Sequence, residues 1–197
     1  MMKRLKSWGL KKMFNWFKKF RQIKKQEKKF NNYIFQHKAK MIKIFYQVIQ
    51  WKECEWFAKD IHLLRDLWYR ILEHDDSLYD KQEYKFFRAQ YYPITPQEKI
   101  DNMKNFEKAL KHHQENNDHH WQYRKDYTVL TTDVKMACIE NILDWVARKK
   151  ETYEKLYDKI DNIEIPSVQK EFMKEFLSIV EKNIQEDDSN DIPQKEK

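Results

Sequence analysis

The chain has 197 residues, of which 15% are aromatic and 36% charged, and its formal net charge is +7 at pH 7. This length fits one domain with terminal extensions, and the aromatic side chains suffice for a sizeable core. Gly9 is the only glycine, which excludes a glycine-rich phosphate loop, a dinucleotide fingerprint and the G-x-S-x-G turn of serine hydrolases.

Positive charge is concentrated at the N-terminus. Residues 1–30 contain twelve Lys or Arg and a single acidic residue, Glu27, and so carry a formal charge of +11. The remainder of the chain therefore carries −4. The basic character belongs to an N-terminal arm and not to the body of the protein.

The pattern of residues 3–30 predicts a basic amphipathic helix. An apolar stripe lies opposite a row of lysines, with Leu10, Met13, Trp16, Phe17, Phe20 and Ile23 on one side and Lys11, Lys12, Lys18, Lys19 and Lys25 on the other. Such a helix suits an anionic membrane surface or the phosphates of a nucleic acid. Alternatively, the aromatic stripe packs against the body while the lysines remain solvated.

The rest of the chain shows helical periodicity without strand alternation or internal repeats. Helices are predicted over about 32–57, 59–74, 80–91, 96–115, 132–148 (with 160 as an alternative end) and 166–184. We therefore expect an all-α bundle of about six to seven helices over residues 31–184, preceded by the helical arm of residues 1–30. Residues 185–197 lack core-forming side chains and are expected to be a disordered acidic tail.

Cysteine usage and hydropathy bear on the location of the protein. Cys54 and Cys138 lie far apart in helical patterns and are expected to be reduced core residues, with a disulfide as the open alternative. No apolar stretch approaches the roughly 20 residues needed to cross a bilayer, and the N-terminus lacks the apolar centre of a secretory signal. We expect a cytoplasmic protein, with peripheral membrane binding through the arm as a further option. The sequence leaves the oligomeric state open.

Imidazoles and carboxylates gather in a few segments of the chain. Four of the seven histidines lie in the run His112-His113-Gln-Glu-Asn-Asn-Asp-His119-His120, a His74-Asp75 pair lies upstream, and Glu140 and Asp144 lie downstream. Both side-chain types present lone pairs to a cation at neutral pH. These residues therefore make the chain a candidate metal-dependent hydrolase.

Helical spacing indicates which candidate ligands face the core. It places His37, Asp75 and His113 on apolar faces and Glu140 and Asp144 at the border of another, whereas His62 and His112 point away. A carboxylate at a core position is costly unless it is paired, protonated or bound to metal. A shared metal site is one explanation for several such residues in one chain.

Each of these residues also has a structural interpretation. His37 alone fits a satisfied core histidine, and Asp75 fits a turn or capping residue. Glu140 and Asp144 are spaced to pair with Arg148 or with lysines of neighbouring helices. His119 and His120 fit a surface groove beside Trp121.

The order of these residues resembles an uncharacterised family of bacteria and phages. The matching segments are His37-Lys38, His74-Asp75-Asp76-Ser77-Leu78-Tyr79, Asn117-Asp118-His119-His120-Trp121 and Glu140-x3-Asp144-Trp145. Members of that family show H-D-x-S-K-F, then H-H-x5-H-H-W with N-P before the second histidine pair, then a D-W helix. The resemblance covers about residues 33–180. This chain departs from the pattern at two positions, with Leu78 for the lysine and Asp118 for the proline.

The order H…HD…HH…D is also similar, more loosely, to the all-α HD-domain phosphohydrolases. That resemblance implies that His37, His74, Asp75 and Asp144 ligate one divalent ion. It further implies that His113, His119 or His120 holds a second ion or a substrate phosphate, and we assign catalytic roles to Glu140 and His119. Mixed ligation of this kind suits Mn, Fe, Co, Ni or Zn, with Mg less favoured. The expected activity is hydrolysis of a nucleotide or another phosphate-containing small molecule.

Two further hypotheses stay open. The chain is alternatively a non-enzymatic binding protein, tethered to a membrane or nucleic acid through its +11 arm. A third hypothesis is that the chain keeps the fold of the family but has lost catalytic activity. The reason is that Leu78 replaces a lysine that could contact phosphate.

Overall fold

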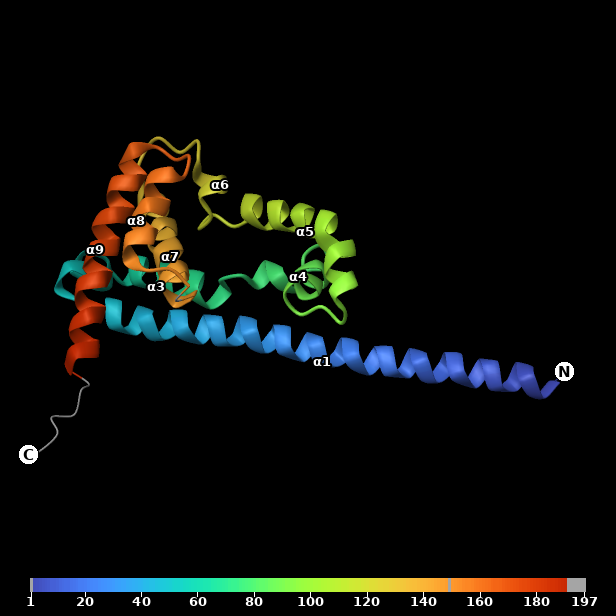
Figure 1. The fold of residues 1–197 in the computed structure, drawn as a ribbon. Helices are drawn as coiled ribbons and strands as arrows, with labels where there is room; N and C mark the ends of the chain where they lie inside the picture. The colour runs from blue at the N-terminus through green and yellow to red at the C-terminus, as the bar shows by residue number, and fades with distance from the viewer. Residues whose placement is uncertain (1, 149, 191–197) are drawn as a thin grey trace, which may run out of the picture. The chain divides into compact units, whose positions relative to one another are not determined.

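The computed structural model describes residues 2–148 and 150–190, and every regular element in this part of the chain is helical (Figure 1). The elements are α1 (Met2–Val48), η1 (Lys52–Cys54), α2 (Glu55–Ala58), α3 (Ile61–Glu73), η2 (Asp76–Tyr79), α4 (Tyr84–Tyr91), α5 (Pro96–Asn116), α6 (Trp121–Arg124), α7 (Thr132–Arg148), α8 (Tyr153–Asn162) and α9 (Ser167–Asn190). The predicted all-α fold class is confirmed. None of the described helices is long and apolar enough to cross a membrane.

Helix boundaries differ from the sequence prediction in three places. A single helix, α1, replaces the predicted pair over 3–30 and 32–57, and it ends at Val48. A separate α8 follows α7, where one longer helix was an alternative. Helix α9 continues to Asn190 and so includes the start of the segment that was expected to be a disordered tail. Residues 191–197 of that segment lie outside the described residues.

The chain divides into two compact units, each of which collects segments far apart in sequence. The first unit contains Met1–Phe35 and Ser77–His113, and the second contains Gln36–Asp76 and Gln114–Lys197. Residues 1–30, predicted to be a separate arm, are therefore grouped with part of the predicted 31–184 domain. Most of the predicted site residues belong to the second unit.

The first unit has a small core between α1, α4 and α5. It is formed by Phe30, Ile34, Leu78, Phe87 and Ala109. Helix α5 begins as predicted, with the Thr95 hydroxyl accepting a hydrogen bond from the Glu98 backbone N–H at 3.1 Å.

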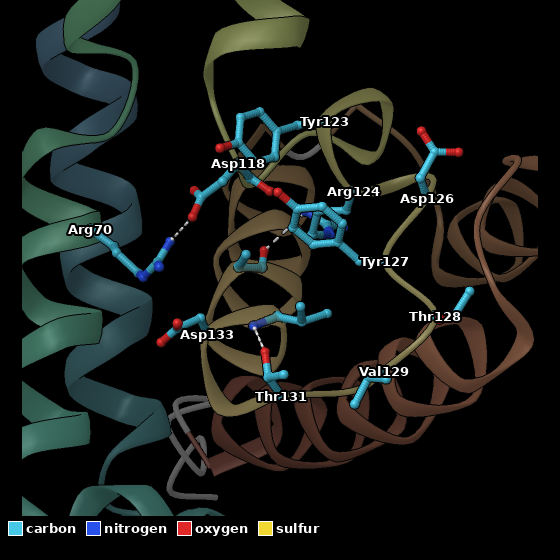
Figure 2. Close-up of a pocket in the computed structure, with 12 residues that line it drawn as sticks. Arg70, Asp118, Tyr123, Arg124, Asp126, Tyr127, Thr128, Val129, Thr131 and Asp133 are labelled. Carbon is cyan, nitrogen blue, oxygen red and sulfur yellow. Dashed lines mark hydrogen bonds and ion pairs between the residues drawn. The ribbon is translucent and has the colours of Figure 1, made fainter.

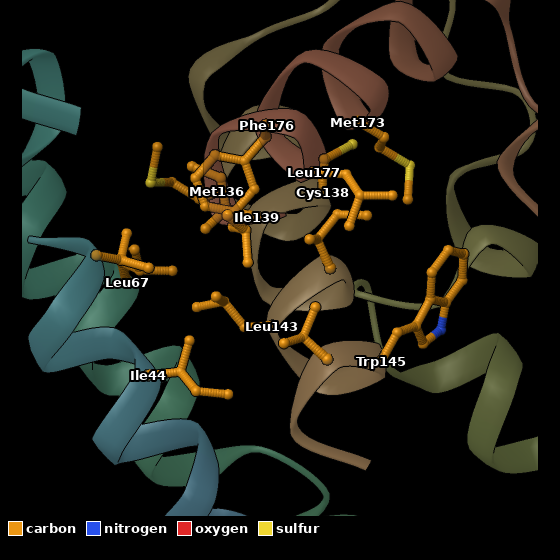
Figure 3. Close-up of a cluster of buried hydrophobic side chains, with 14 of the residues drawn as sticks. Ile44, Leu67, Met136, Cys138, Ile139, Leu143, Trp145, Met173, Phe176 and Leu177 are labelled. Atoms are coloured by element: carbon orange, nitrogen blue, oxygen red, sulfur yellow. The ribbon is translucent and has the colours of Figure 1, made fainter. Parts of the chain in front are cut away.

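The second unit is built around α7. Every residue of this helix from Met136 to Ala147 is buried, because α7 lies against α3 and α9 and is enclosed by the remainder of the unit. Figure 3 shows its apolar side chains among those of the neighbouring helices, with Ile44 and Leu67 on one side and Phe176 and Leu177 on another. A helix buried on all sides places its polar residues in the interior too. Cys54 and Cys138 are buried free thiols, so the disulfide alternative is wrong.

Candidate metal centre

The His74-Asp75 pair lies where the chain leaves α3. His74 follows the last residue of the helix with φ −50° and ψ 129°, and Asp75 has φ 57°. A left-handed conformation at a residue other than glycine costs on the order of 1 kcal/mol or more and is concentrated at functional sites. This turn places both side chains in the interior, where His74 and Asp75 are 2% and 4% exposed.

Helices α7 and α1 supply the other side chains of the cluster. Glu140 and Asp144 lie one turn apart on α7, and both are buried. His37 lies on the part of α1 that belongs to the second unit and is also buried. The sequence placed the two carboxylates at the border of an apolar face, whereas the structure places them deep inside because α7 is covered on every side.

Nitrogen and oxygen atoms converge around Asp144. Its Oδ1 lies 2.8 Å from His37 Nε2 and 3.4 Å from His74 Nε2. The same His74 Nε2 lies 3.5 Å from Asp75 Oδ2. This buried nitrogen makes no hydrogen bond within the described part of the chain. Ligand atoms of His37, His74 and Asp144 therefore lie within 4.8 Å of one another, and Asp75 adjoins this group through His74.

Glu140 fixes the orientation of two imidazole rings. Its Oε1 lies 2.9 Å from His74 Nδ1 and 3.3 Å from His119 Nδ1. An ionised carboxylate only accepts hydrogen bonds, so both Nδ1 atoms carry hydrogen and act as donors to it. The Nε2 atoms consequently lie on the far side of each ring, and that of His119 is 3.7 Å from Asp75 Oδ1. A carboxylate behind a histidine in this way is the usual support of a metal ligand.

The charge balance of the cluster favours ionised carboxylates. Burial raises the pKa of Glu140, but the neighbouring His119 and His74 outweigh this effect and lower it to about 2. Burial likewise opposes ionisation of Asp144, yet Arg148, His37 and His74 hold its pKa well below the ordinary value. Burial lowers the pKa of His74, and the surrounding carboxylates, Asp75 first, overcome this and raise it to about 10. The carboxyl groups of Glu140 and Asp144 are thus ionised at neutral pH and paired with cationic neighbours.

The spacing of the converging atoms fits a single metal ion. Two atoms that each lie about 2.1 Å from one ion are about 3.0 Å apart at a right angle and about 3.4 Å apart at a tetrahedral angle. The separations around His74 Nε2 and Asp144 Oδ1 are 2.8, 3.4 and 3.5 Å. Imidazole and carboxylate donors together suit Mn, Fe, Co, Ni or Zn.

The sequence pattern of a family of unknown function, DUF5662, matches residues 26–186. The chain belongs to this family. The predicted resemblance to an uncharacterised family is thereby confirmed, and the match contains every residue of the cluster. No curated protein and no solved structure matches the chain, so the looser resemblance to HD domains stays a prediction.

The remaining predicted ligands of this DUF5662 protein are His113 and His120. The His120 ring lies 4.2 Å from that of His119, centroid to centroid. His113 belongs to the first unit, where its Nδ1 lies 3.0 Å from Glu83 Oε2 and 2.9 Å from Ser77 Oγ. Its assignment as a metal ligand stays a prediction.

Glu83 is a buried polar residue that sequence reasoning did not assign to the site. Its side chain is fully buried, and its second oxygen lies 2.7 Å from His112 Nδ1. The histidines and Ser77 outweigh the effect of burial and lower the pKa of this carboxyl group. The signal that could have found it is its place six residues after Ser77, close behind the His-Asp-x-Ser segment.

A pocket in the second unit lies beside the histidine cluster, with a cavity volume of about 540 Å³ (Figure 2). Arg70 connects the two: its Nη1 lies 2.6 Å from Asp118 Oδ2 in the pocket and 3.7 Å from Glu140 Oε2 in the cluster. Tyr123 and Tyr127 line the opposite part of the pocket, with ring centroids 6.0 Å apart. The sequence analysis did not select Arg70, because an arginine at this position does not disturb the amphipathic pattern of α3.

Arg124 supports the segment that carries the histidine pair, although it lies outside the cluster. It is 1% exposed and donates hydrogen bonds to the backbone carbonyls of Asp118, at 2.8 Å, and of His119. A further donor contact reaches Asn141 Oδ1 on α7 at 3.2 Å. The guanidinium group therefore fixes the loop before α6 against α7, at the level of Glu140.

Proposed function

We propose that this DUF5662 protein is a divalent-metal-dependent phosphohydrolase with His37, His74, Asp75 and Asp144 as its metal ligands. The observation that carries the proposal is the convergence of buried His37, His74 and Asp144, from three separate segments, with ligand atoms within 4.8 Å of one another. Asp75 adjoins them, with its Oδ2 3.5 Å from His74 Nε2. The reaction class rests on the order His, His-Asp, Asp, which is similar to that of HD-domain phosphohydrolases. Mn, Fe, Co, Ni or Zn is the expected ion, with Mg less favoured.

A divalent ion in such a site lowers the pKa of a water ligand and clamps a phosphoryl oxygen. Arg148 is the chain's own candidate for binding the phosphate. Its Nε lies 2.7 Å from Asp144 Oδ1, and 30% of the side chain is exposed. An arginine guanidinium group forms paired hydrogen bonds with phosphate, and Arg148 would supply this contact beside a metal ion held by Asp144.

His119 is the residue that we propose for proton transfer. With Nδ1 held by Glu140 at 3.3 Å, its Nε2 is left on the side of Asp75, where it can protonate a leaving oxygen. Glu140, which the sequence analysis assigned a catalytic role, contacts ring nitrogens of two histidines and Arg70. These contacts favour a positioning role for Glu140.

The substrate class that fits best is a nucleotide or another small phosphoester. A cavity of about 540 Å³ falls in the range of small-molecule sites. Tyr123 and Tyr127 offer aromatic faces to a ring, and the hydroxyl groups of Thr128 and Thr131 can bind a sugar. Arg70 places this pocket directly next to the proposed centre.

A second candidate is a family member in which the same cluster is an ion-pair network without turnover. The observation that favours it is that Arg148 and Arg70 already lie near Asp144, Asp75 and Glu140. Leu78, the substitute for the lysine of the family motif, is 5% exposed and packs in the core of the first unit. It can make no polar contact with a phosphate.

Metal content separates these candidates. Elemental analysis of the purified chain should find about one equivalent of a transition metal, and His74→Ala and Asp144→Asn should abolish it. His62→Ala is the matched control, because His62 is an exposed histidine on α3. Metal that survives both site substitutions, or a wild-type chain that binds none after incubation with Mn, Co or Zn, would overturn the assignment.

Activity is tested separately with the metal-loaded chain. Release of phosphate from nucleoside monophosphates, or of nitrophenol from its phosphate esters, should require the metal and fall at least 100-fold in His119→Ala while the metal content is retained. A metal-loaded chain that hydrolyses neither class of phosphoester contradicts the phosphohydrolase assignment.

A further inference from the structure

Four aromatic side chains near the start of α1 are exposed. Phe14, Trp16, Phe17 and Phe20 have exposed fractions of 77%, 59%, 48% and 44%. Three of the rings contact one another, with Trp16 stacked on Phe20 at 5.6 Å between centroids and edge-on to Phe17 at 5.0 Å. They form a contiguous patch, which we call the aromatic patch, and soluble chains rarely expose such a surface without a partner.

Burial of α1 within the first unit begins only after this patch. Gln26 Nε2 donates a hydrogen bond to the Pro93 carbonyl at 3.4 Å, and Phe30 and Ile34 are almost completely buried. The DUF5662 match also begins at residue 26. Residues 1–25 therefore lie outside the family match, and the exposed rings of Phe14, Trp16, Phe17 and Phe20 take no part in the core of the first unit.

The same segment is strongly basic. Residues 1–25 contain ten Lys or Arg and no acidic residue. Arg21 and Lys24 follow the aromatic patch by about one helical turn, and Lys24 Nζ lies 5.8 Å from the centre of the Phe20 ring. Cations at the edge of an aromatic surface reach lipid phosphates while the rings enter the acyl boundary.

We propose that the N-terminal segment of α1 is an interfacial helix that docks the protein on an anionic lipid bilayer through the aromatic patch. An anionic bilayer is the partner that fits, because the segment is basic and its exposed rings are apolar. The rings carry no hydrogen-bonding group other than the Trp16 indole N–H, and they stack on one another, which suits hydrocarbon better than intercalated bases. A helix with such a basic and aromatic surface lies in the plane of the interface.

Vesicle flotation with the full chain tests this inference. The wild type should bind vesicles of phosphatidylcholine with 30% phosphatidylserine and leave pure phosphatidylcholine vesicles largely unbound. The triple variant Trp16→Ser/Phe17→Ser/Phe20→Ser should bind the anionic vesicles at least 10-fold more weakly, with unchanged helix content by circular dichroism. Arg21→Gln/Lys24→Gln/Lys25→Gln should weaken binding and reduce its salt dependence.

Phe35→Ser is the matched control, because Phe35 is 65% exposed on the same helix but outside the aromatic patch. It should bind anionic vesicles as the wild type does. Equal binding by the triple aromatic variant and the wild type would overturn the inference, as would tighter binding to duplex or single-stranded DNA that depends on the same three rings. Metal content, measured on the same variants, should not change, so this result is independent of the proposed activity.

Discussion

The Nδ1 atom of His74 lies 2.9 Å from Oε1 of Glu140, and both side chains are buried. His74 enters from the turn after α3, and Glu140 enters from the middle of α7. Since the same oxygen also lies 3.3 Å from His119 Nδ1, one carboxylate orients two rings. The proposed metal centre therefore depends on a supporting residue that would not itself be a ligand.

Glu140→Gln should weaken metal binding without abolishing it. A glutamine keeps the shape but loses the charge that holds both Nδ1–H groups, and loss of such a supporting residue costs about 10–100-fold in metal affinity. Competition with a chromogenic chelator measures the affinity. Asp144→Asn, which removes a ligand, should lose binding altogether.

The control for this prediction is Glu73→Gln, an exposed carboxylate adjacent to His74 in sequence. It should keep wild-type affinity. If Glu140→Gln also keeps wild-type affinity, Glu140 does not support the centre.

Arg124→Met should destabilise the protein by on the order of 3 kcal/mol, because it leaves buried carbonyl groups of Asp118 and His119 without their donor. Urea denaturation followed by circular dichroism measures the loss. The exposed Arg65 of α3 provides the control, and Arg65→Met should change stability by less than about 0.5 kcal/mol. Equal stability of the two variants would contradict the supporting role of Arg124.

Stability should decrease on the acid side partly through Glu98 in the first unit. Burial raises the pKa of this carboxyl group, but Arg88 and the Ile94 backbone N–H outweigh that effect and lower it below 4.5. A carboxyl group with a lowered folded-state pKa stabilises the protein fully above its unfolded pKa and loses this contribution as pH falls through the folded value. Urea midpoints of Glu98→Gln should therefore depend less steeply on pH below about pH 4.5 than those of the wild type.

The control for this prediction is Glu107→Gln, which removes a carboxylate at an exposed site of α5. Glu107→Gln should retain the wild-type pH dependence. Indistinguishable acid profiles for Glu98→Gln and the wild type would show that the Arg88 pair does not affect acid stability.

Helical periodicity predicted much of the secondary structure because it is a local property of the sequence. The start of α5 at Pro96 and of α7 at Thr132 agree with the prediction, since capping residues act on their own first turn. The break expected near residue 31 is absent. Packing of Phe30 and Ile34 in the first unit stabilises a continuous helix there, which local pattern does not reveal.

The residue types and order of the candidate site were visible in the sequence. Which of these residues contact one another was visible only in the structure. His37, His74 and Asp144 offer ligand atoms within 4.8 Å of one another, and Asp75 lies 3.5 Å from His74. The sequence had placed His37 and Asp75 on apolar faces and Asp144 at the border of one. Glu140 contacts two histidines from behind. Arg70 and Arg124 had no distinguishing signal in the sequence, because contacts with residues distant along the chain define them.

By itself the sequence determined the helical class, the basic N-terminal segment and the set of side chains able to bind a cation, because composition and a 3.6-residue period are fixed by the order of residues. Only the tertiary structure decided that His37, His74 and Asp144 offer ligand atoms within 4.8 Å of one another, with Asp75 against His74. It also decided that the aromatic rings at residues 14–20 stay exposed. Both outcomes depend on which segments, distant along the chain, pack together and exclude water.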